Sequence, residues 1–211
     1  MNRDNIYYFN GTAYAGKSTM VRMLAEKYGG IVCEENYHDS WPETLDSRED
    51  PCLTYTRDLK DWQDFIRRTP DEYEAWVRGV TLECERIELK ILETLDSDHQ
   101  KVFVDTNITP ETLWRISDTR HVLIMLADPE ISVRRFFERP DREKQFLYRL
   151  LMEEPDPEAA KANFQACLER INSQAAYDAF LNSGFQVILR DDRRSPEETM
   201  RLAEKAFGFI D

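Results

Sequence analysis

The sequence has few cysteines and histidines and no long apolar run. Among its 211 residues are three histidines and four cysteines, Cys33, Cys52, Cys84 and Cys167. The cysteines form no Cys-x-x-Cys pair and the histidines have no metal-ligand spacing, so neither a zinc site nor a disulfide framework is indicated. No stretch approaches the roughly 20 apolar residues that span a bilayer, and the first ten residues make a poor secretory signal. We therefore expect a cytoplasmic protein with reduced thiols and no membrane contact.

Basic residues are also scarce relative to acidic ones. The chain has 28 Lys and Arg against 41 Asp and Glu, a formal net charge of −13. Such a charge repels polyanions, which argues against a general role in nucleic-acid binding. A small phosphorylated ligand stays compatible with it, because a few local cations overcome the net field at one site. We expect small-molecule ligands and a monomer or homodimer.

Short apolar runs alternate with helical patterns along the chain. The predicted strands are Ile6–Phe9, Ile31–Cys33, Val102–Val104, Val122–Leu126 and Phe185–Leu189. The predicted helices cover about 17–28, 56–68, 71–95, 158–181 and 196–207. A short helix is also expected after Pro110, and a helix after Pro129 that enters the arginine-rich stretch at 134–149. This alternation is typical of a parallel sheet covered by helices on both faces. We expect one three-layer α/β/α domain over 1–211, with a helical region at 36–98 that binds an acceptor.

The loop after the first strand carries the most specific motif. Residues 11–18 read GTAYAGKS and match the P-loop pattern GxxxxGK[ST] between an apolar strand and an amphipathic helix. Glycines let backbone N–H groups turn inward around phosphates, and the helix N-terminus adds its positive dipole. We expect ATP to contact Gly11, Thr12, Ala13, Tyr14, Ala15, Gly16, Lys17, Ser18 and Thr19. Lys17 would reach the β- and γ-phosphates, and the Ser18 hydroxyl would ligate Mg²⁺.

Carboxylates follow the second and third predicted strands. Asp105 ends the third strand, where it would hold Mg²⁺ directly or through water. Glu34 and Glu35 end the second strand, and open α/β sheets bind ligands at that edge. A carboxylate there could accept a proton from an acceptor hydroxyl. We favour Glu34 over Glu35 as this base and leave Asp105 as a further candidate.

These elements resemble the P-loop small-molecule kinases, which include nucleoside monophosphate, shikimate, gluconate and deoxynucleoside kinases. The resemblance covers the architecture of the whole chain, while in sequence only the loop at 11–18 is specific. It implies sheet order 2-3-1-4-5, ATP-dependent phosphoryl transfer, and an acceptor bound near the ends of strands 2 and 3. Subfamily motifs are missing, because the third strand ends in Asp105-Thr106-Asn107 without the Asp-Gly-aromatic-Pro-Arg run. The acceptor therefore stays open between a nucleoside, a nucleotide and a small hydroxy metabolite.

The resemblance also implies a lid that carries arginines, here expected at 134–157. Arg135, Arg139 and Arg142 recur at spacings of four and three, so one helix would place them on one side. The planar guanidinium binds phosphate through two hydrogen bonds, which suits a transferring phosphoryl group. The alternative is a solvated helix with Arg–Glu pairs. By the same resemblance, the loop at 190–193 would frame the base of the nucleotide.

The region from 36 to 98 is rich in arginines and aromatics. We expect Arg57 and Arg78 to contact a phosphate or carboxylate of the acceptor. The aromatics Trp62, Phe65, Tyr73 and Trp76 fit helix faces and are better explained as core residues than as a stacking site.

Other nucleotide-binding classes fit the sequence less well. A regulatory GTPase needs an Asn/Thr-Lys-x-Asp string and an Asp-x-x-Gly string, and neither occurs in the chain. ATPase motors usually have a glutamate after the strand-3 aspartate, whereas Thr106 follows Asp105 here. A nucleotide-binding sensor without kinase activity stays open as the alternative, although Lys17 and Ser18 argue against lost turnover.

Overall fold

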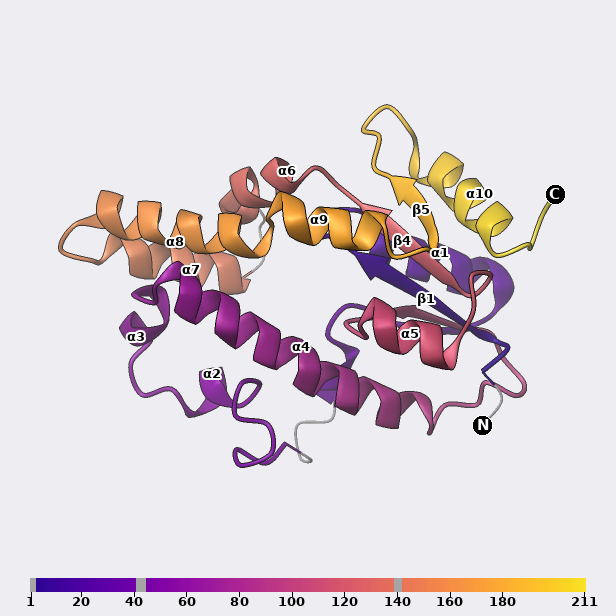
Figure 1. Ribbon diagram of the computed structural model, residues 1–211, viewed down its shortest axis with the longest axis horizontal. Helices are drawn as coiled ribbons and strands as arrows, with labels where there is room; N and C mark the ends of the chain where they lie inside the picture. The colour runs from indigo at the N-terminus through magenta and orange to yellow at the C-terminus, as the bar shows by residue number, and fades with distance from the viewer. Residues whose placement is uncertain (1–2, 41–44, 139–141) are drawn as a thin grey trace. The chain divides into compact units, whose positions relative to one another are not determined.

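A five-stranded, all-parallel sheet forms the centre of the protein's α/β fold. The computed structural model of the chain describes residues 3–40, 45–138 and 142–211 (Figure 1). The strands are β1 (Ile6–Gly11), β2 (Ile31–Cys33), β3 (Val102–Asp105), β4 (Val122–Leu126) and β5 (Gln186–Leu189). Their order is β2-β3-β1-β4-β5, which confirms the parallel sheet expected from the sequence and the order 2-3-1-4-5 that the family resemblance implies.

The chain divides into two compact units. The first, here called the sheet unit, comprises residues 1–44, 81–127 and 177–211, and the second, the helical unit, comprises 45–80 and 128–176. Helices of the sheet unit are α1 (Lys17–Tyr28), α5 (Pro110–Ile116) and α10 (Pro196–Ala206). Helices of the helical unit are α2 (Tyr55–Asp58), α3 (Gln63–Ile66), α6 (Pro129–Arg134), α7 (Arg142–Met152) and α8 (Pro157–Ile171). Both α4 (Pro70–Leu92) and α9 (Gln174–Leu181) contribute residues to each unit.

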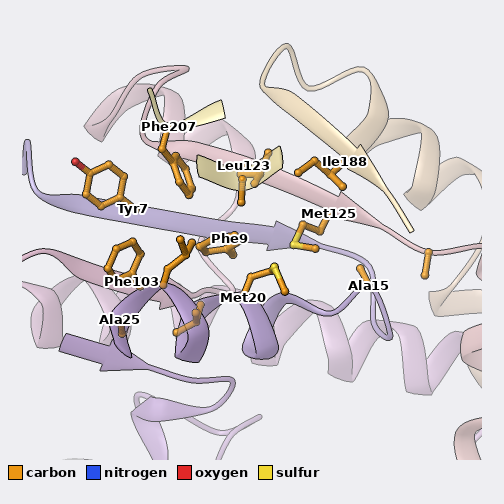
Figure 2. Close-up of a cluster of buried hydrophobic side chains, with 14 residues drawn as sticks. Tyr7, Phe9, Ala15, Met20, Ala25, Phe103, Leu123, Met125, Ile188 and Phe207 are labelled. Atoms are coloured by element: carbon orange, nitrogen blue, oxygen red, sulfur yellow. The ribbon is translucent and has the colours of Figure 1, made fainter. Parts of the chain in front are cut away.

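The two faces of the sheet bury separate apolar clusters. Alternate residues of a strand point to opposite faces, so Tyr7 and Phe9 of β1 lie on one face and Ile6 and Tyr8 on the other. The first cluster packs against α1 and α10, and Figure 2 shows Phe207 beside Tyr7 and Phe9. The second cluster packs against α4, α5 and α9. This covering of both faces explains why every residue of β3 and β4 is buried.

Helix starts follow the capping signals of the sequence. The side chains of Thr109, Asp128, Asp156 and Ser195 each accept a hydrogen bond from a backbone N–H in the first turn of the helix that follows, and a proline comes next. Ser195 and Glu198 form both halves of the capping box expected for the last helix. Such caps contribute about 1 kcal/mol each, so they place the helix starts firmly.

The helix predicted over 56–68 is wrong, because the chain breaks it into α2 and α3. Leu59 takes an extended conformation with φ −67° and ψ 127°. The Asp61 carboxylate then accepts a hydrogen bond from the Gln63 N–H at 2.9 Å. An Asp side chain that bonds nearby backbone offers an alternative to continuing a helix.

The helix predicted over 158–181 is also wrong, since α8 ends at Ile171 and α9 begins at Gln174. At the end of α8, the Asn172 side chain donates to the Leu168 carbonyl at 2.9 Å, in addition to the Asn172 backbone N–H at 3.0 Å. Ser173 Oγ then accepts from the Ala176 N–H at 3.3 Å and caps α9. Two polar side chains thus end one helix and start the next.

The single helix expected to carry Arg135, Arg139 and Arg142 is a third error. Arg135 lies just past the end of α6, a short 3-10 helix follows at Phe136–Glu138, and Arg142 begins α7. Arg139 lies outside the described residues. Because the sequence has a proline at 140, which lacks an amide hydrogen, one continuous helix across this segment is disfavoured.

The helical unit has an aromatic core of its own. Phe65 and Tyr73 are buried. Trp62 and Trp76 pack against them, and residues of α7 and α8 belong to the same cluster. The rings of Phe65 and Trp76 meet edge to face, with centroids 5.1 Å apart. These contacts confirm that Trp62, Phe65, Tyr73 and Trp76 belong to the core of the helical unit.

Candidate functional site

The loop between β1 and α1 depends on backbone conformations that only glycine adopts readily. Gly11 has φ 124°, and a Cβ added there would collide with the Met125 carbonyl oxygen. Gly16 has φ 94° and is the residue that precedes the first turn of α1. Tyr14 also has a positive φ, 63°, which is uncommon for a bulky side chain and marks a constrained turn. The loop is therefore held in a specific shape.

Hydrogen bonds tie this loop to the carboxyl end of β4. The Thr12 N–H donates to the Met125 carbonyl at 3.1 Å, and the Ala127 N–H donates to Thr12 Oγ1 at 2.7 Å. At the start of the loop, the Asn10 side chain accepts from the Gly11 N–H. The sequence motif does not distinguish Thr12 from its neighbours, yet its hydroxyl joins two segments 115 residues apart.

Lys17, Ser18 and Asp105 converge beside the loop. Phe9 of β1 pairs with Asp105, so the end of β3 lies next to the loop that leaves β1. Ser18 Oγ donates to Asp105 Oδ2 at 2.7 Å, and Lys17 Nζ lies 3.8 Å from Asp105 Oδ1. Lys17 Nζ also donates to the Thr12 carbonyl at 3.0 Å. The structure thus brings together the three residues that the sequence selects from separate motifs.

Asp105 is a buried carboxyl with an altered pKa. Its side chain is 3% exposed, and this burial raises its pKa above the usual value. The charge of Lys17 and the hydrogen bond from Ser18 oppose the rise, while Glu35 and Glu88 add to it. A carboxyl whose pKa is raised binds protons more readily, and such groups gather at functional sites.

Two cavities of the sheet unit are lined in part by residues of the loop. The first, here called the Asp105 cavity, has a volume of about 250 Å³, and its lining includes Lys17, Glu35, Asp105, Asn107 and Phe180. The second, the Arg190 cavity, has a volume of about 260 Å³, and its lining includes Gly16, Thr19, Arg190, Asp191 and Arg194. Residues of the loop therefore line two separate cavities.

The loop after β5 lines the Arg190 cavity and contacts the glycine loop. The Arg190 guanidinium donates to the Tyr14 carbonyl and, through Nε, to Asp192 Oδ1 at 2.8 Å. Of the segment 190–193, Arg190, Asp191 and Asp192 line the cavity, together with Arg194. The segment named from the sequence is thus brought beside the glycine loop.

Two glutamates of α4, which the sequence reasoning missed, hold the segment after β3. The fully buried Glu88 carboxylate accepts from Thr106 Oγ1 at 2.6 Å, from the Asn107 N–H at 3.0 Å and from Asn107 Nδ2 at 2.8 Å. Glu85 accepts from Thr109 Oγ1 at 2.6 Å. Both glutamates look like ordinary charges of an exposed helix in the sequence, so no local signal identifies them.

Glu85 has a lowered pKa as a result of these contacts. Burial alone would raise the pKa, but hydrogen bonds from Thr109 and Thr112 and the charge of Arg115 outweigh it. Glu85 is therefore held as a carboxylate that accepts hydrogen bonds from the start of α5.

The Glu88 carboxylate also meets a buried histidine and cysteine. Glu88 Oε1 lies 3.6 Å from His38 Nδ1, and His38 Nε2 lies 3.4 Å from Cys84 Sγ. All three side chains are buried. Burial raises the pKa of the nearby Cys33 thiol to about 12, with the Glu88 charge adding to the effect. Cys33 is accordingly held as a neutral thiol at neutral pH.

The two carboxylates at the end of β2 differ in position. Cys33 pairs with Val104, which brings the end of β2 next to the end of β3. Glu35 lines the Asp105 cavity. Glu34 is absent from that lining, and its half-exposed carboxylate lies 3.2 Å from Arg22. The structure therefore places Glu35, rather than the Glu34 favoured from the sequence, at the cavity.

The arginines expected to bind the acceptor lie in the helical unit and have local partners. Arg57 Nε donates to Asp58 at 2.8 Å, and Arg57 Nη2 donates to Ser47 Oγ at 2.9 Å. Arg78 lies 3.9 Å from Glu74, one turn away on the same helix. Both arginines belong to the helical unit, whereas Lys17, Ser18 and Asp105 belong to the sheet unit.

The lid candidates also belong to the helical unit. Arg135 Nε lies 3.8 Å from Glu138 Oε2, and both side chains are exposed. Arg142 is exposed in the first turn of α7. Each is therefore accessible to solvent in its own unit.

The oxygen donors at the loop fit a nucleotide-bound Mg²⁺ better than a metal held by protein alone. Over residues 3–40, 45–138 and 142–211, no group of three or more His, Cys, Asp or Glu side chains is placed to hold a metal. Ser18 and Asp105 supply two neighbouring oxygen donors. Mg²⁺ commonly binds one or two protein oxygens and completes its shell with phosphates and water, so this pair suits it.

Comparisons of the chain with protein-family models, curated proteins and solved structures find no match. Among the helices that the structure describes, none has the length and apolar character needed to cross a membrane. The function must therefore be argued from the chemistry of the site.

Proposed function

We propose that this chain is an ATP-dependent phosphotransferase that acts, with Mg²⁺, on a hydroxyl group of a small molecule. The observation that carries the proposal is the convergence of Lys17, Ser18 and Asp105 on a loop with left-handed glycines at its two ends. A cation, a hydroxyl and a carboxylate at the N-terminus of a helix are the groups that P-loop enzymes use on a nucleoside triphosphate. The acceptor is a nucleoside, a nucleotide or a small hydroxy metabolite.

Binding of the nucleotide follows from the loop and the Arg190 cavity. Backbone N–H groups of residues 11–18 and the N-terminus of α1 would receive the phosphates. Lys17 would contact the β- and γ-phosphates, and Ser18 with Asp105 would hold Mg²⁺, which neutralises charge on the phosphates when bound. The Arg190 cavity, whose lining includes Gly16 and Thr19, would receive the base.

The reaction transfers the terminal phosphoryl group to the acceptor. A P–O bond forms between the acceptor hydroxyl oxygen and the terminal phosphorus, while the bond from that phosphorus to the bridging oxygen breaks. The electron pair of the broken bond leaves with the nucleoside diphosphate. Glu35 would take the hydroxyl proton, because it lines the Asp105 cavity while Asp105 already accepts from Ser18. The proton then passes to water.

Arginines of the helical unit would add positive charge during transfer. Arg135, Arg139 and Arg142 are the candidates, because the transferring phosphoryl group is stabilised by spread positive charge more than by covalent chemistry. The solvent exposure of Arg135 and Arg142 supports this role, since an exposed guanidinium can exchange a local partner for a phosphate.

The proposal is tested by nucleotide binding and by turnover measured separately. Thermal unfolding is followed with and without Mg–ATP, and we expect Mg–ATP to raise the midpoint, because a ligand that binds only the folded state stabilises it. Release of ADP is then measured with a panel of nucleosides, nucleoside monophosphates, sugars, shikimate and gluconate. We expect turnover that depends on an added acceptor.

A matched pair of lysine variants locates the activity. We expect Lys17→Ala to lower turnover at least 100-fold, the scale of losing one preorganised group that stabilises transition-state charge. Lys205→Ala, an exposed position on α10, should keep turnover within twofold. Full turnover in Lys17→Ala would refute the site. Stabilisation by Mg–ATP without turnover of any acceptor would favour a nucleotide-binding sensor or NTPase.

A further inference from the structure

We propose that the acceptor is an uncharged ring compound rich in hydroxyl groups, a free sugar or nucleoside, rather than its phosphate ester or a carboxylic acid. This inference rests on the proposed phosphotransfer and narrows its substrate class. It is carried by the charges, hydrogen bonds and apolar surface of the Asp105 cavity. Part of that lining does not enter the assignment of the nucleotide site: Glu35, Thr106, Thr109, Pro110 and Phe180.

The charges that line the Asp105 cavity disfavour an anionic acceptor. Among the described residues that line it, Lys17 is the only cation, while Glu35 and Asp105 are carboxylates. Lys17 already contacts Asp105 and would contact the nucleotide phosphates. A second phosphate or a carboxylate in the cavity would face like charges without a cation of its own, which costs free energy at these distances. A neutral acceptor avoids that cost.

Hydrogen bonds within the cavity wall occupy its hydroxyl donors, so the wall is rich in hydrogen-bond acceptors. Thr106 and Thr109 line the cavity, but each hydroxyl donates to a glutamate of α4, Glu88 and Glu85 respectively. The Glu35 side chain makes no hydrogen bond or ion pair within the described part of the chain, and it lies at the cavity with both oxygens available. Carboxylate oxygens only accept hydrogen bonds, so they recognise hydroxyl groups that donate.

The remaining surface is apolar and the cavity is small. Ala13, Pro110 and Phe180 contribute carbon-rich surface to the same lining. The volume of about 250 Å³ falls just below the range of roughly 300–1,000 Å³ that is typical of pockets for drug-sized ligands. A sugar or nucleoside presents hydroxyl edges for the carboxylate and a carbon-bearing face for the apolar side, so it matches both halves of this wall.

The test compares neutral acceptors with their anionic counterparts. ADP release is measured at saturating Mg–ATP with matched pairs: nucleoside and nucleoside monophosphate, hexose and hexose phosphate, glucose and gluconate. We expect the neutral member of at least one pair to have a kcat/KM at least tenfold above that of its anionic partner. The nucleoside and hexose arms then tell which kind of ring is used. A higher kcat/KM for every anionic member would overturn the inference.

A pair of glutamate variants tests the role of the cavity wall. Glu35→Gln should lower kcat/KM for the neutral acceptor about tenfold, through kcat, and narrow the preference over its anionic partner. Glu26→Gln, the same change at an exposed position of α1, should stay within twofold. An unchanged preference in Glu35→Gln would contradict the inference.

Binding of Mg–ATP separates the failure of this inference from that of the proposed function. Glu35→Gln should keep the thermal shift with Mg–ATP, because Glu35 is absent from the lining of the Arg190 cavity. A normal shift with preference for phosphorylated acceptors overturns the acceptor class alone. If Mg–ATP gives no thermal shift in the unmodified protein, or if no acceptor supports turnover, both the proposed phosphotransferase activity and the acceptor class are overturned.

Discussion

The sheet unit and the helical unit both carry many charged side chains, but the charged side chains that bear on the candidate site are held differently in the two units. In the sheet unit, charges such as Asp105 and Glu88 are buried and bound by groups far away in sequence. In the helical unit, Arg57 and Arg78 are exposed and paired with acidic neighbours one and four residues away. The first arrangement is built by tertiary structure, whereas the second needs only local chain geometry.

This difference distinguishes charged side chains that are fixed in position from those that can exchange one partner for another. A buried charge keeps its position because losing its partners would leave it uncompensated in a poor solvent for ions. An exposed ion pair contributes roughly 0–1 kcal/mol, so it gives way easily to a stronger ligand. We therefore expect changes in the sheet unit to affect turnover more than changes in the helical unit, and the predictions below test this comparison.

The largest expected effect follows from removing the charge of Asp105. Asp105→Asn keeps the shape of the side chain but gives Lys17 and Ser18 a neutral partner and removes a proposed Mg²⁺ ligand. We expect acceptor-dependent turnover to fall at least 100-fold, measured in a steady-state assay. Asp58→Asn, the same change in an exposed pair of the helical unit, should stay within twofold. Equal losses of turnover at both positions would contradict the expected difference between the two units.

A smaller effect is expected from Glu88→Gln, because Glu88 positions the cavity wall without reaching the acceptor. Thr106 and Asn107 would lose an acceptor oxygen for their three hydrogen bonds, which should destabilise the fold by about 1–3 kcal/mol in urea unfolding. We expect kcat/KM to fall about tenfold, mainly through KM for the acceptor.

A control and a binding measurement distinguish this role from a general loss of structure. Glu93→Gln, an exposed position just past the end of α4, should change neither quantity. The thermal shift with Mg–ATP should persist in Glu88→Gln, since Glu88 is not part of the Arg190 cavity. A Glu88→Gln variant with normal KM and lowered kcat would show that the glutamate does more than hold the wall.

Arg142→Ala tests whether the helical unit takes part in transfer at all. We expect kcat to fall about fivefold with the unfolding midpoint unchanged, because Arg142 is exposed and its proposed phosphate contact forms only during transfer. Arg149→Ala, an exposed arginine near the other end of α7, serves as the matched control. If both variants keep full kcat, the arginines of α7 are a solvated surface, as the alternative reading of the sequence holds.

The smallest effect on turnover is expected from a buried charge away from the site. Glu204 of α10 is 1% exposed and accepts from Lys27 Nζ and from the Tyr28 hydroxyl at 2.6 Å. Burial alone would raise its pKa, but these hydrogen bonds outweigh burial and lower the pKa below the usual 4.5. A lowered folded pKa means that Glu204 contributes stability above about pH 4.5, which is lost as the pH falls through the folded pKa.

Unfolding of Glu204→Gln at two pH values checks this sign. At pH 7 we expect the variant to be less stable by about 1–3 kcal/mol, with turnover unchanged. The difference should shrink as the pH falls through the folded pKa, because the carboxyl of the unmodified protein then takes up a proton in the folded state as well. A constant difference across this range would mean that the ion pair with Lys27 is not the source of the stability.

Sequence reasoning succeeded where the relevant chemistry is local. The alternation of apolar strands and amphipathic helices indicated the parallel sheet, while its order came from a family resemblance. The cap at Ser195 and the loop between β1 and α1 were found because they depend on residues a few positions apart. It failed at the helix breaks near Asp61 and Asn172, where one polar side chain competes with the helix for backbone hydrogen bonds.

The sequence by itself determined the strands, the capped helix starts, the glycine loop and the candidate trio of Lys17, Ser18 and Asp105, because strand periodicity, capping and turn chemistry act over short distances. Only the tertiary structure decided that Glu35 rather than Glu34 lines the cavity and that Glu88 holds its wall. Glu34 and Glu35 are neighbours at the end of β2, and the path of the backbone decides which of them faces the cavity. Glu88 lies on a helix, and its role comes only from the segment packed against it. Those facts depend on contacts between residues far apart in the chain.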